Sequence, residues 1–184
     1  MKPGKIIYLN GISAAGKTTL SKKLQERASE PFYWVASDMF CSEMAPKKFW
    51  DGDEAVTLLL NTVKFYSSIG INSIVDIVHI KSDEAQVDLL HEAVKLLHDC
   101  PILFANVTCP TDELARRKVE RGDFEVEKWL PYQLERFYPK ASYDITVDTH
   151  NSTVEECADK ILELLELPEK LTAFQTLWDE YNLR

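Results

Sequence analysis

An eight-residue segment near the start of the chain constrains the fold more than any other feature of the sequence. Residues 11–18 read Gly-Ile-Ser-Ala-Ala-Gly-Lys-Thr, which matches the pattern G-x-x-x-x-G-K-[ST] at every fixed position. A strand-like apolar run, Lys5–Leu9, precedes the segment, and a helical pattern, Thr18–Ala28, follows it. A loop that opens a helix in this way can turn backbone N–H groups inward, where they bind phosphate. The segment predicts a phosphate-binding loop, with a glycine-rich surface turn as the competing interpretation.

The residue types of this loop suit a nucleotide. Gly11 and Gly16 permit an unusual backbone turn. Lys17 can reach the β- and γ-phosphates, and Thr18 can offer its hydroxyl to Mg²⁺. The sequence lacks the N-K-x-D tetrad that reads guanine, which favours ATP over GTP. We therefore expect ATP and Mg²⁺ as cofactors, the nucleotide being held by Gly11, Ser13, Ala14, Ala15, Gly16, Lys17, Thr18 and Thr19.

Strand-like apolar runs alternate with helical patterns along the whole chain. This alternation predicts an α/β fold in which a parallel sheet carries helices on both faces. With the phosphate loop after the first strand, residues 1–184 are expected to form a single P-loop NTPase domain. The five expected strands are Lys5–Leu9, Phe32–Ala36, Ser73–Val78, Ile102–Val107 and Tyr143–Val147.

Apolar spacing and N-cap signals place the helices between these strands. Ser82 and Thr111 are candidate N-caps, and Ser152–Glu155 has the pattern of a capping box. The amphipathic C-terminal helix, about residues 170–182, is expected to pack on the domain, with docking of a protein partner as the alternative. The expected helices after the first are Gly52–Ser68, Asp83–Asp99, Thr111–Arg121, Val126–Phe137, Ser152–Leu165 and Leu171–Tyr181.

Two carboxylates follow strands of the predicted sheet, at the edge where such sheets bind ligands. Asp38 follows the second strand and could accept a proton from an acceptor hydroxyl, or could simply cap the next helix. Asp76 ends the apolar run Ile74-Val75-Asp76, a pattern that suits a ligand of Mg²⁺ or of magnesium-bound water. His79 stands at the same strand end, where a structural role competes with contact to an acceptor.

A basic cluster follows the fourth strand of this acidic chain. Arg117 and Arg121 are four residues apart and share a helix face, and Gly122 ends the helix. Two guanidinium groups there could bind phosphates and stabilise a transferring phosphoryl group. The alternative is a solvated charged face paired with Glu113 and Glu120. The cluster begins a lid-like segment, about residues 116–140, which contains an aromatic-rich helix. This helix could close over the site as a lid, or it could form one wall of the acceptor site; ordinary packing on the domain is the alternative.

Composition restricts the partners. The chain of 184 residues has 21 Lys+Arg and 30 Asp+Glu, a formal net charge of −9. This charge argues against a general nucleic-acid or anionic-membrane binder. No apolar run approaches the roughly 18 residues of a membrane span, and the run at residues 6–9 is too short for a signal peptide. The four cysteines form no C-x-x-C pair, so we expect reduced thiols in a cytoplasmic protein.

Taken together, these motifs resemble the chloramphenicol phosphotransferase-like family of P-loop kinases. The resemblance implies a nucleoside-monophosphate-kinase-like sheet and transfer of the γ-phosphoryl group of ATP to a small-molecule hydroxyl. It also implies that Asp38 is the general base, because Asp38 matches the catalytic aspartate of the family. The resemblance to the family rests on Ile6–Thr18, Ser37-Asp38, Ile74–Asp76, Arg117 with Arg121-Gly122-Asp123, Tyr143–Thr149 and Glu155–Ala158.

The chain departs from the family pattern on the acceptor and lid side. Phe124 stands where the family usually has Arg, and Ile77 where it often has a second acid; Phe137 or Tyr138 replaces a lid His. The phosphoryl-donor motifs are intact, whereas the acceptor and the oligomeric state stay open. The expected catalytic residues are Asp38, Lys17, Arg117 and Arg121; the expected metal ligands are Thr18 and Asp76; and Phe40, Met44, Trp50 and His79 are candidate acceptor contacts.

Two other functions fit the same fold. A nucleoside-monophosphate or other metabolite kinase would need acceptor-side arginines for a phosphorylated acceptor, yet no Arg occurs between Asp38 and Asp99. A nucleotide-binding switch that binds a protein partner would need no general base. Asp38 and the paired arginines therefore favour a small-molecule kinase over the switch.

Overall fold

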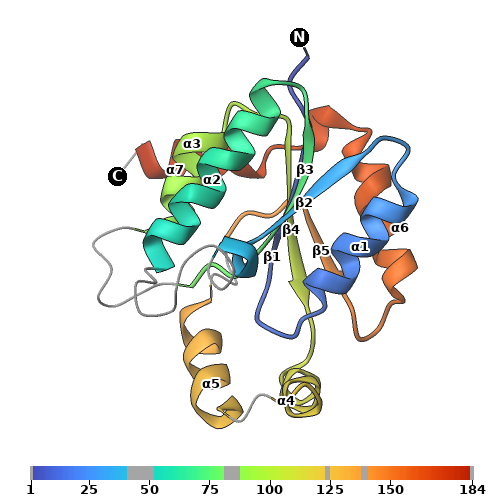
Figure 1. Cartoon of the computed structure of the whole chain (residues 1–184), viewed down its shortest axis with the longest axis vertical. Coiled ribbons are helices and arrows are strands. Elements are labelled where there is room, and N and C mark those ends of the chain that lie inside the picture. Colours follow the sequence, from blue (N-terminus) through green and yellow to red (C-terminus); the bar gives the residue numbers. More distant parts are fainter. Residues whose placement is uncertain (1, 41–51, 81–87, 123–124, 138–140, 183–184) are drawn as a thin grey trace.

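The computed structural model describes residues 2–40, 52–80, 88–122, 125–137 and 141–182. Its centre is a five-stranded parallel sheet in the order β2-β3-β1-β4-β5 (Figure 1). The strands are β1 (Ile6–Asn10), β2 (Phe32–Ala36), β3 (Asn72–Ile77), β4 (Ile102–Thr108) and β5 (Ile145–Asp148). The α/β fold and the five parallel strands predicted from the sequence are confirmed.

Helices cover both faces of the sheet and one of its ends (Figure 1). Contacts pair α1 with α6 on one face and join α2, α3 and α7 on the other. Helices α4 and α5 lie beyond the carboxyl ends of the strands. The bounds are α1 (Lys17–Arg27), α2 (Gly52–Ser68), α3 (Leu89–Leu97), α4 (Thr111–Glu120), α5 (Val126–Arg136), α6 (Val154–Leu165) and α7 (Ala173–Asn182), with a 3-10 helix at Pro168–Lys170.

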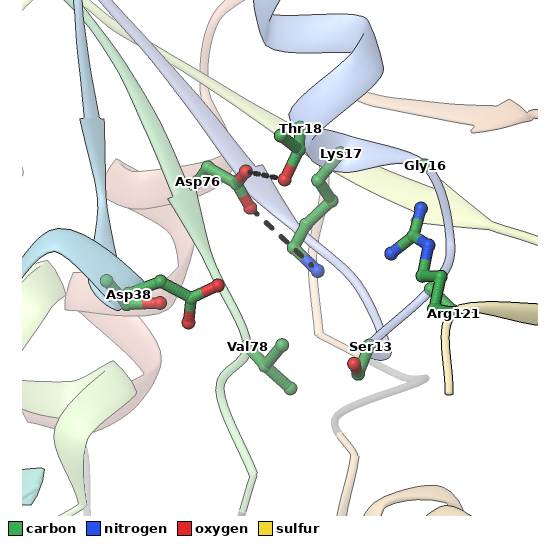
Figure 2. A pocket seen from close by; sticks show the side chains of 10 residues that line it. Ser13, Gly16, Lys17, Thr18, Asp38, Asp76, Val78 and Arg121 are labelled. Atoms are coloured by element: carbon green, nitrogen blue, oxygen red, sulfur yellow. Dashed lines mark hydrogen bonds and ion pairs between the residues drawn. The ribbon is translucent and has the colours of Figure 1, made fainter. Parts of the chain in front are cut away.

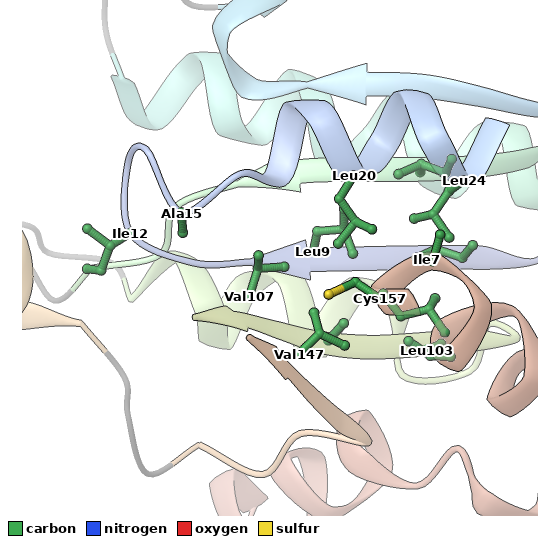
Figure 3. Close-up of a cluster of buried hydrophobic side chains, with 14 of the residues drawn as sticks. Ile7, Leu9, Ile12, Ala15, Leu20, Leu24, Leu103, Val107, Val147 and Cys157 are labelled. Carbon is green, nitrogen blue, oxygen red and sulfur yellow. The ribbon is translucent and has the colours of Figure 1, made fainter. Parts of the chain in front are cut away.

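Each face of the sheet has its own hydrophobic core. Between the sheet and α1 and α6, Leu9 and Leu20 pack with Val147 and Cys157 (Figure 3). On the other face, Tyr8 and Phe104 pack against α2, α3 and α7. Every residue of β1 is buried, as expected for a central parallel strand. The phosphate loop leaves this rigid strand at its carboxyl end, so its position is fixed by both cores.

Several helix starts differ from the sequence prediction. Asp88 caps α3 by accepting hydrogen bonds from Leu90 N and His91 N; the expected cap Ser82 lies outside the described residues. Pro110, not Thr111, is the N-cap of α4, and no side chain caps that helix. The capping box of α6 joins Thr153 and Glu156, one residue later than predicted, because the helix begins at Val154.

The C-terminal helix α7 packs on the domain. Phe174 and Leu177 are buried, and the Phe174 ring contacts Tyr8 and Phe104. The Asp144 carboxylate holds the start of the helix by accepting hydrogen bonds from Thr172 N and Ala173 N. Its other oxygen accepts a hydrogen bond from Phe104 N, and β5 begins at the next residue, Ile145. The apolar face of α7 is thus buried against the rest of the domain.

Among the described residues, no helix is long and apolar enough to cross a membrane.

Candidate active site

The phosphate loop has two residues in the left-handed backbone region. Gly16 has φ 93° and stands at the N-cap of α1, and Ala14 has φ 71°. Gly11, unlike Gly16, does not have a positive φ. A Cβ atom at Gly11 would lie 2.4 Å from Val107 O, and glycine is therefore needed for the close approach of β4.

A polar pocket opens at the carboxyl ends of β1, β2 and β3. Figure 2 shows Lys17 between Asp38 on one side and Arg121 on the other, with Asp76 and Thr18 at the base. Ser37 and Val78 also line the pocket, although sequence reasoning did not assign them to the site. Val78 follows Asp76 by two residues, so strand alternation could have placed it on the same side. The predicted residues that meet here are Ser13, Ala14, Gly16, Lys17, Thr18, Asp38, Asp76 and Arg121.

The base of the pocket joins the loop to β3. The Thr18 hydroxyl donates a hydrogen bond of 2.8 Å to Asp76 Oδ2, and Lys17 Nζ lies 3.9 Å from Asp76 Oδ1. Lys17 Nζ also donates to Gly11 O at 2.8 Å and to Ile12 O at 3.3 Å. Only 7% of the Lys17 side chain and 8% of the Asp76 side chain are exposed. Both charges are therefore removed from most of the solvent.

Burial governs the titration of this pair. It lowers the pKa of Lys17, and the nearby Asp76 and Asp38 carboxylates oppose that shift. It likewise raises the pKa of Asp76, against the influence of Lys17 and the Thr18 hydrogen bond. A multiply charged anion beside a buried ammonium stabilises the charged form of that ammonium. The pocket is suited to phosphate groups, which would offset the burial of Lys17.

The donor set at the base also suits Mg²⁺. One hydroxyl and one carboxylate converge there, and hard oxygen ligands are what this ion prefers. Mg²⁺ usually keeps several waters and takes one or two protein carboxylates together with substrate phosphates. Thr18 and Asp76 would be its protein ligands, directly or through water.

The two arginines of the basic cluster have different environments. Arg121 lines the pocket at the end of α4, next to Gly122 with φ 78°. Arg117 does not line it. Its guanidinium donates to Glu113 Oε1 at 2.7 Å and to the Thr149 hydroxyl and carbonyl at 3.0 and 3.1 Å. The expectation that both arginines face the phosphates is therefore corrected for Arg117, which lies against the outer side of the loop.

Of the predicted acceptor contacts, the two that the structure describes, Phe40 and His79, do not line the pocket. His79 is buried, and its Nε2 lies 2.7 Å from the Tyr8 hydroxyl. This places the imidazole in the interior beside Tyr8, so its assignment to the acceptor is corrected. Phe40 packs partly against the same core. Met44 and Trp50 lie outside the described residues.

Other predicted nucleotide contacts stand beside the pocket. Gly11 and Ala15 are buried within the loop, and Thr19 is exposed on the first turn of α1. The lid-like segment contributes α5, which is held by the buried Leu130. From this helix Gln133 Oε1 reaches Ser13 N at 3.4 Å, and Phe137 forms an isolated bridge with Ile80. The segment thus touches both the loop and the strand end that follows Asp76.

Comparisons with known proteins found relatives in sequence and in fold. A curated Mycobacterium tuberculosis protein named "Putative O-phosphotransferase" is 28% identical over 192 residues, covering 89% of this chain and 83% of its own length. The M. tuberculosis APS kinase in complex with AMPPNP and APS superposes with a TM-score of 0.70 at 14% identity, over 90% of this chain and 99% of that chain. Shikimate kinase from Acinetobacter baumannii gives a TM-score of 0.58 at 18% identity, over 89% and 94%.

These solved structures share the fold of this chain, a P-loop kinase fold. The family described as chloramphenicol phosphotransferase-like protein matches residues 4–166, which include the phosphate loop, Asp38, Asp76 and the basic cluster. The chain therefore belongs to the chloramphenicol phosphotransferase-like protein family.

Proposed function

We propose that this protein is an ATP-dependent kinase that transfers the γ-phosphoryl group to a hydroxyl of a small molecule. The observation that carries the proposal is the placement of Asp38 and Arg121 around the ammonium of Lys17 (Figure 2). A carboxylate and a guanidinium on either side of a phosphate loop supply a proton acceptor and a stabiliser of transferring charge. A pocket that only held a nucleotide would need no general base.

Each residue of the pocket then has a chemical task. Loop N–H groups and Lys17 bind the β- and γ-phosphates of ATP. Asp38 is exposed at the end of β2, where an acceptor can approach, and it accepts the proton of the attacking hydroxyl. Arg121 offsets the negative charge on the migrating phosphoryl group. When Mg²⁺ is bound, it neutralises phosphate charge, and Thr18 and Asp76 are the residues that would hold it.

The acceptor is proposed only as a class. The family name points to chloramphenicol as one candidate, and the mycobacterial relative's name to phosphorylation at oxygen. Hydroxylated small molecules are therefore the acceptors to test.

A panel assay tests the proposal. The protein would be incubated with Mg·ATP and hydroxylated small molecules, including aromatic antibiotics, nucleosides and nucleoside monophosphates, while ADP release is followed. We expect ADP release that depends on one class of acceptor and yields a phosphorylated product. ATP binding without acceptor-dependent turnover across the panel would favour a nucleotide-binding switch. Turnover restricted to nucleoside monophosphates would favour a nucleotide kinase.

A further inference from the structure

The loop that leaves β5 contacts the outer side of the phosphate loop through one side chain. The Thr149 hydroxyl donates a hydrogen bond of 2.8 Å to Ala15 O and accepts one of 3.0 Å from Arg117. Its methyl and hydroxyl also lie 3.4 Å from where a Cβ atom would stand on Gly16. Thr149 therefore touches the turn where the phosphate loop becomes α1.

Thr149 is itself held in place from two sides. Its backbone N–H donates to Thr108 O at 3.1 Å, which continues the pairing of β4 and β5. Arg117 reaches its carbonyl at 3.1 Å, and Glu113 fixes Arg117 through an ion pair of 2.7 Å. The Thr149 hydroxyl is thus a fixed point between the sheet, α4 and the phosphate loop.

The phosphate loop needs such support on its outer side. Ala14 has φ 71°, a conformation that costs a non-glycine residue free energy unless surrounding contacts hold it. When the loop N–H groups turn toward phosphate, neighbouring carbonyls turn away from it and require donors of their own. Arg117 supplies one for Ala14 O, at 3.5 Å, and Thr149 supplies one for Ala15 O.

We propose that Thr149 is a positioning residue for the phosphate-binding loop. Through its hydroxyl, and with Arg117 behind it, Thr149 holds the carbonyls of Ala14 and Ala15 outward, so that the loop N–H groups stay directed at the phosphates. This inference rests on the proposed function only in taking the loop as a phosphate site. According to this inference, Thr149 affects the binding of the phosphates of any ligand and takes no part in the recognition of the adenine.

Two substitutions separate the hydroxyl from the shape of the side chain. Thr149→Val keeps the packing against Gly16 and removes the hydroxyl, whereas Thr149→Ser keeps the hydroxyl. The probes are ADP and inorganic tripolyphosphate, each with Mg²⁺, measured by calorimetry on the full chain. We expect Thr149→Val to weaken the binding of both probes by about tenfold. This is the size of effect that the loss of one hydrogen bond to a buried carbonyl produces. Thr149→Ser should bind both within about twofold of the wild type.

A matched control tests whether lost stability alone weakens binding. Thr153 caps α6 with its hydroxyl, so Thr153→Val also removes a threonine hydroxyl bonded to the backbone. We expect Thr153→Val to lower the unfolding temperature and leave both affinities unchanged. A loss of affinity in Thr153→Val similar to that in Thr149→Val would overturn the positioning role.

The remaining outcomes are equally decisive. Unchanged binding of both probes by Thr149→Val would overturn the inference while leaving the proposed kinase function intact. Weakened ADP binding with unchanged tripolyphosphate binding would indicate that Thr149 contacts the adenine, and would contradict the inference. If wild-type protein bound neither probe, the inference and the proposed function would both fail. A panel without any phosphorylated product would leave the binding result, and so this inference, standing.

Discussion

The Thr18 hydroxyl donates a 2.8 Å hydrogen bond to Asp76 and so joins the helix after the first strand to the end of the third. Burial of the Asp76 carboxylate, which raises its pKa, makes a divalent cation a favourable partner. Asp76→Asn keeps the shape of this side chain and removes its charge. We expect it to raise the Mg²⁺ concentration needed for half-maximal turnover by about tenfold or more, since even the loss of a group that only supports a metal ligand typically costs about 10–100-fold in metal affinity. Mg²⁺ titration of ADP release measures this; an unchanged midpoint would contradict the assignment.

Lys17 is a buried cation of the pocket, with only 7% of its side chain exposed. Lys17→Ala is expected to abolish turnover and to weaken ATP binding, because the phosphates lose their charged partner. Lys23→Ala is the control, since Lys23 pairs with Glu26 of α1 and Glu155 of α6 and does not line the pocket. Calorimetric titration of ATP and an ADP-release assay on both variants check the prediction. Wild-type turnover in Lys17→Ala would contradict it.

Asp38 is the proposed general base. Asp38→Asn is expected to reduce transfer by about 100-fold or more, the usual contribution of general base catalysis, while ATP binding is retained. Asp99→Asn is the matched control, because Asp99 is paired with Lys64 on the surface, away from the pocket. Initial rates and ATP affinity are the two measurements. Normal transfer by Asp38→Asn would show that the base is another group.

Substitutions of Arg121 and of Arg116, a further arginine of α4, test whether the position of Arg121 in the pocket matters. Arg121 lines the pocket, whereas Arg116 pairs with Glu113 and Glu120 on an exposed helix face. Arg121→Ala is expected to lower kcat by about 100-fold with ADP affinity nearly unchanged, because its contact is made to transferring charge. Arg116→Ala should stay close to wild type. An equal loss in both variants would assign the effect to the charge of the whole cluster.

Much of the site followed from sequence because parallel strands end at one edge of the sheet. That geometry alone brought Asp38 and Asp76, which are far apart in sequence, to the phosphate loop. It failed for His79 because the side chains of a strand alternate. Asp76 and Val78 face the pocket, whereas Ile77 and His79 face the core around Tyr8. Applying the alternation beyond the end of β3 would have given the correct side.

The role of Arg117 could not be predicted from helix periodicity. Spacing places Arg117 and Arg121 on one face of α4, but it does not show which neighbour each guanidinium meets. Thr149 directly follows β5 and stands 32 residues after Arg117, and it accepts hydrogen bonds from Arg117 through both its hydroxyl and its carbonyl. Such a partner depends on the packing of β5 beside β4, a tertiary contact that local patterns do not specify.

His79 gives a prediction for stability against pH. Burial lowers the pKa of its imidazole from 6.5 to about 4 in the folded protein. Between these values the unfolded chain binds the proton more readily, so the free energy of unfolding falls as the pH falls from about 6.5 to about 4, by up to about 3 kcal/mol. His79→Gln is expected to flatten this part of the curve, even if it is less stable overall. The exposed His150→Gln serves as the control, and urea unfolding at several pH values measures both. An unchanged slope in His79→Gln would refute the assignment.

The central claim is direct transfer of the γ-phosphoryl group of ATP to an acceptor hydroxyl. The most direct test follows an isotopic label in that group, with each acceptor of the panel, by phosphorus NMR and mass spectrometry of the products. We predict that the label appears as a phosphate monoester on an acceptor, and that Lys17→Ala and Asp38→Asn suppress this product. Label found only in inorganic phosphate, or retained in ATP with every acceptor, would contradict the account.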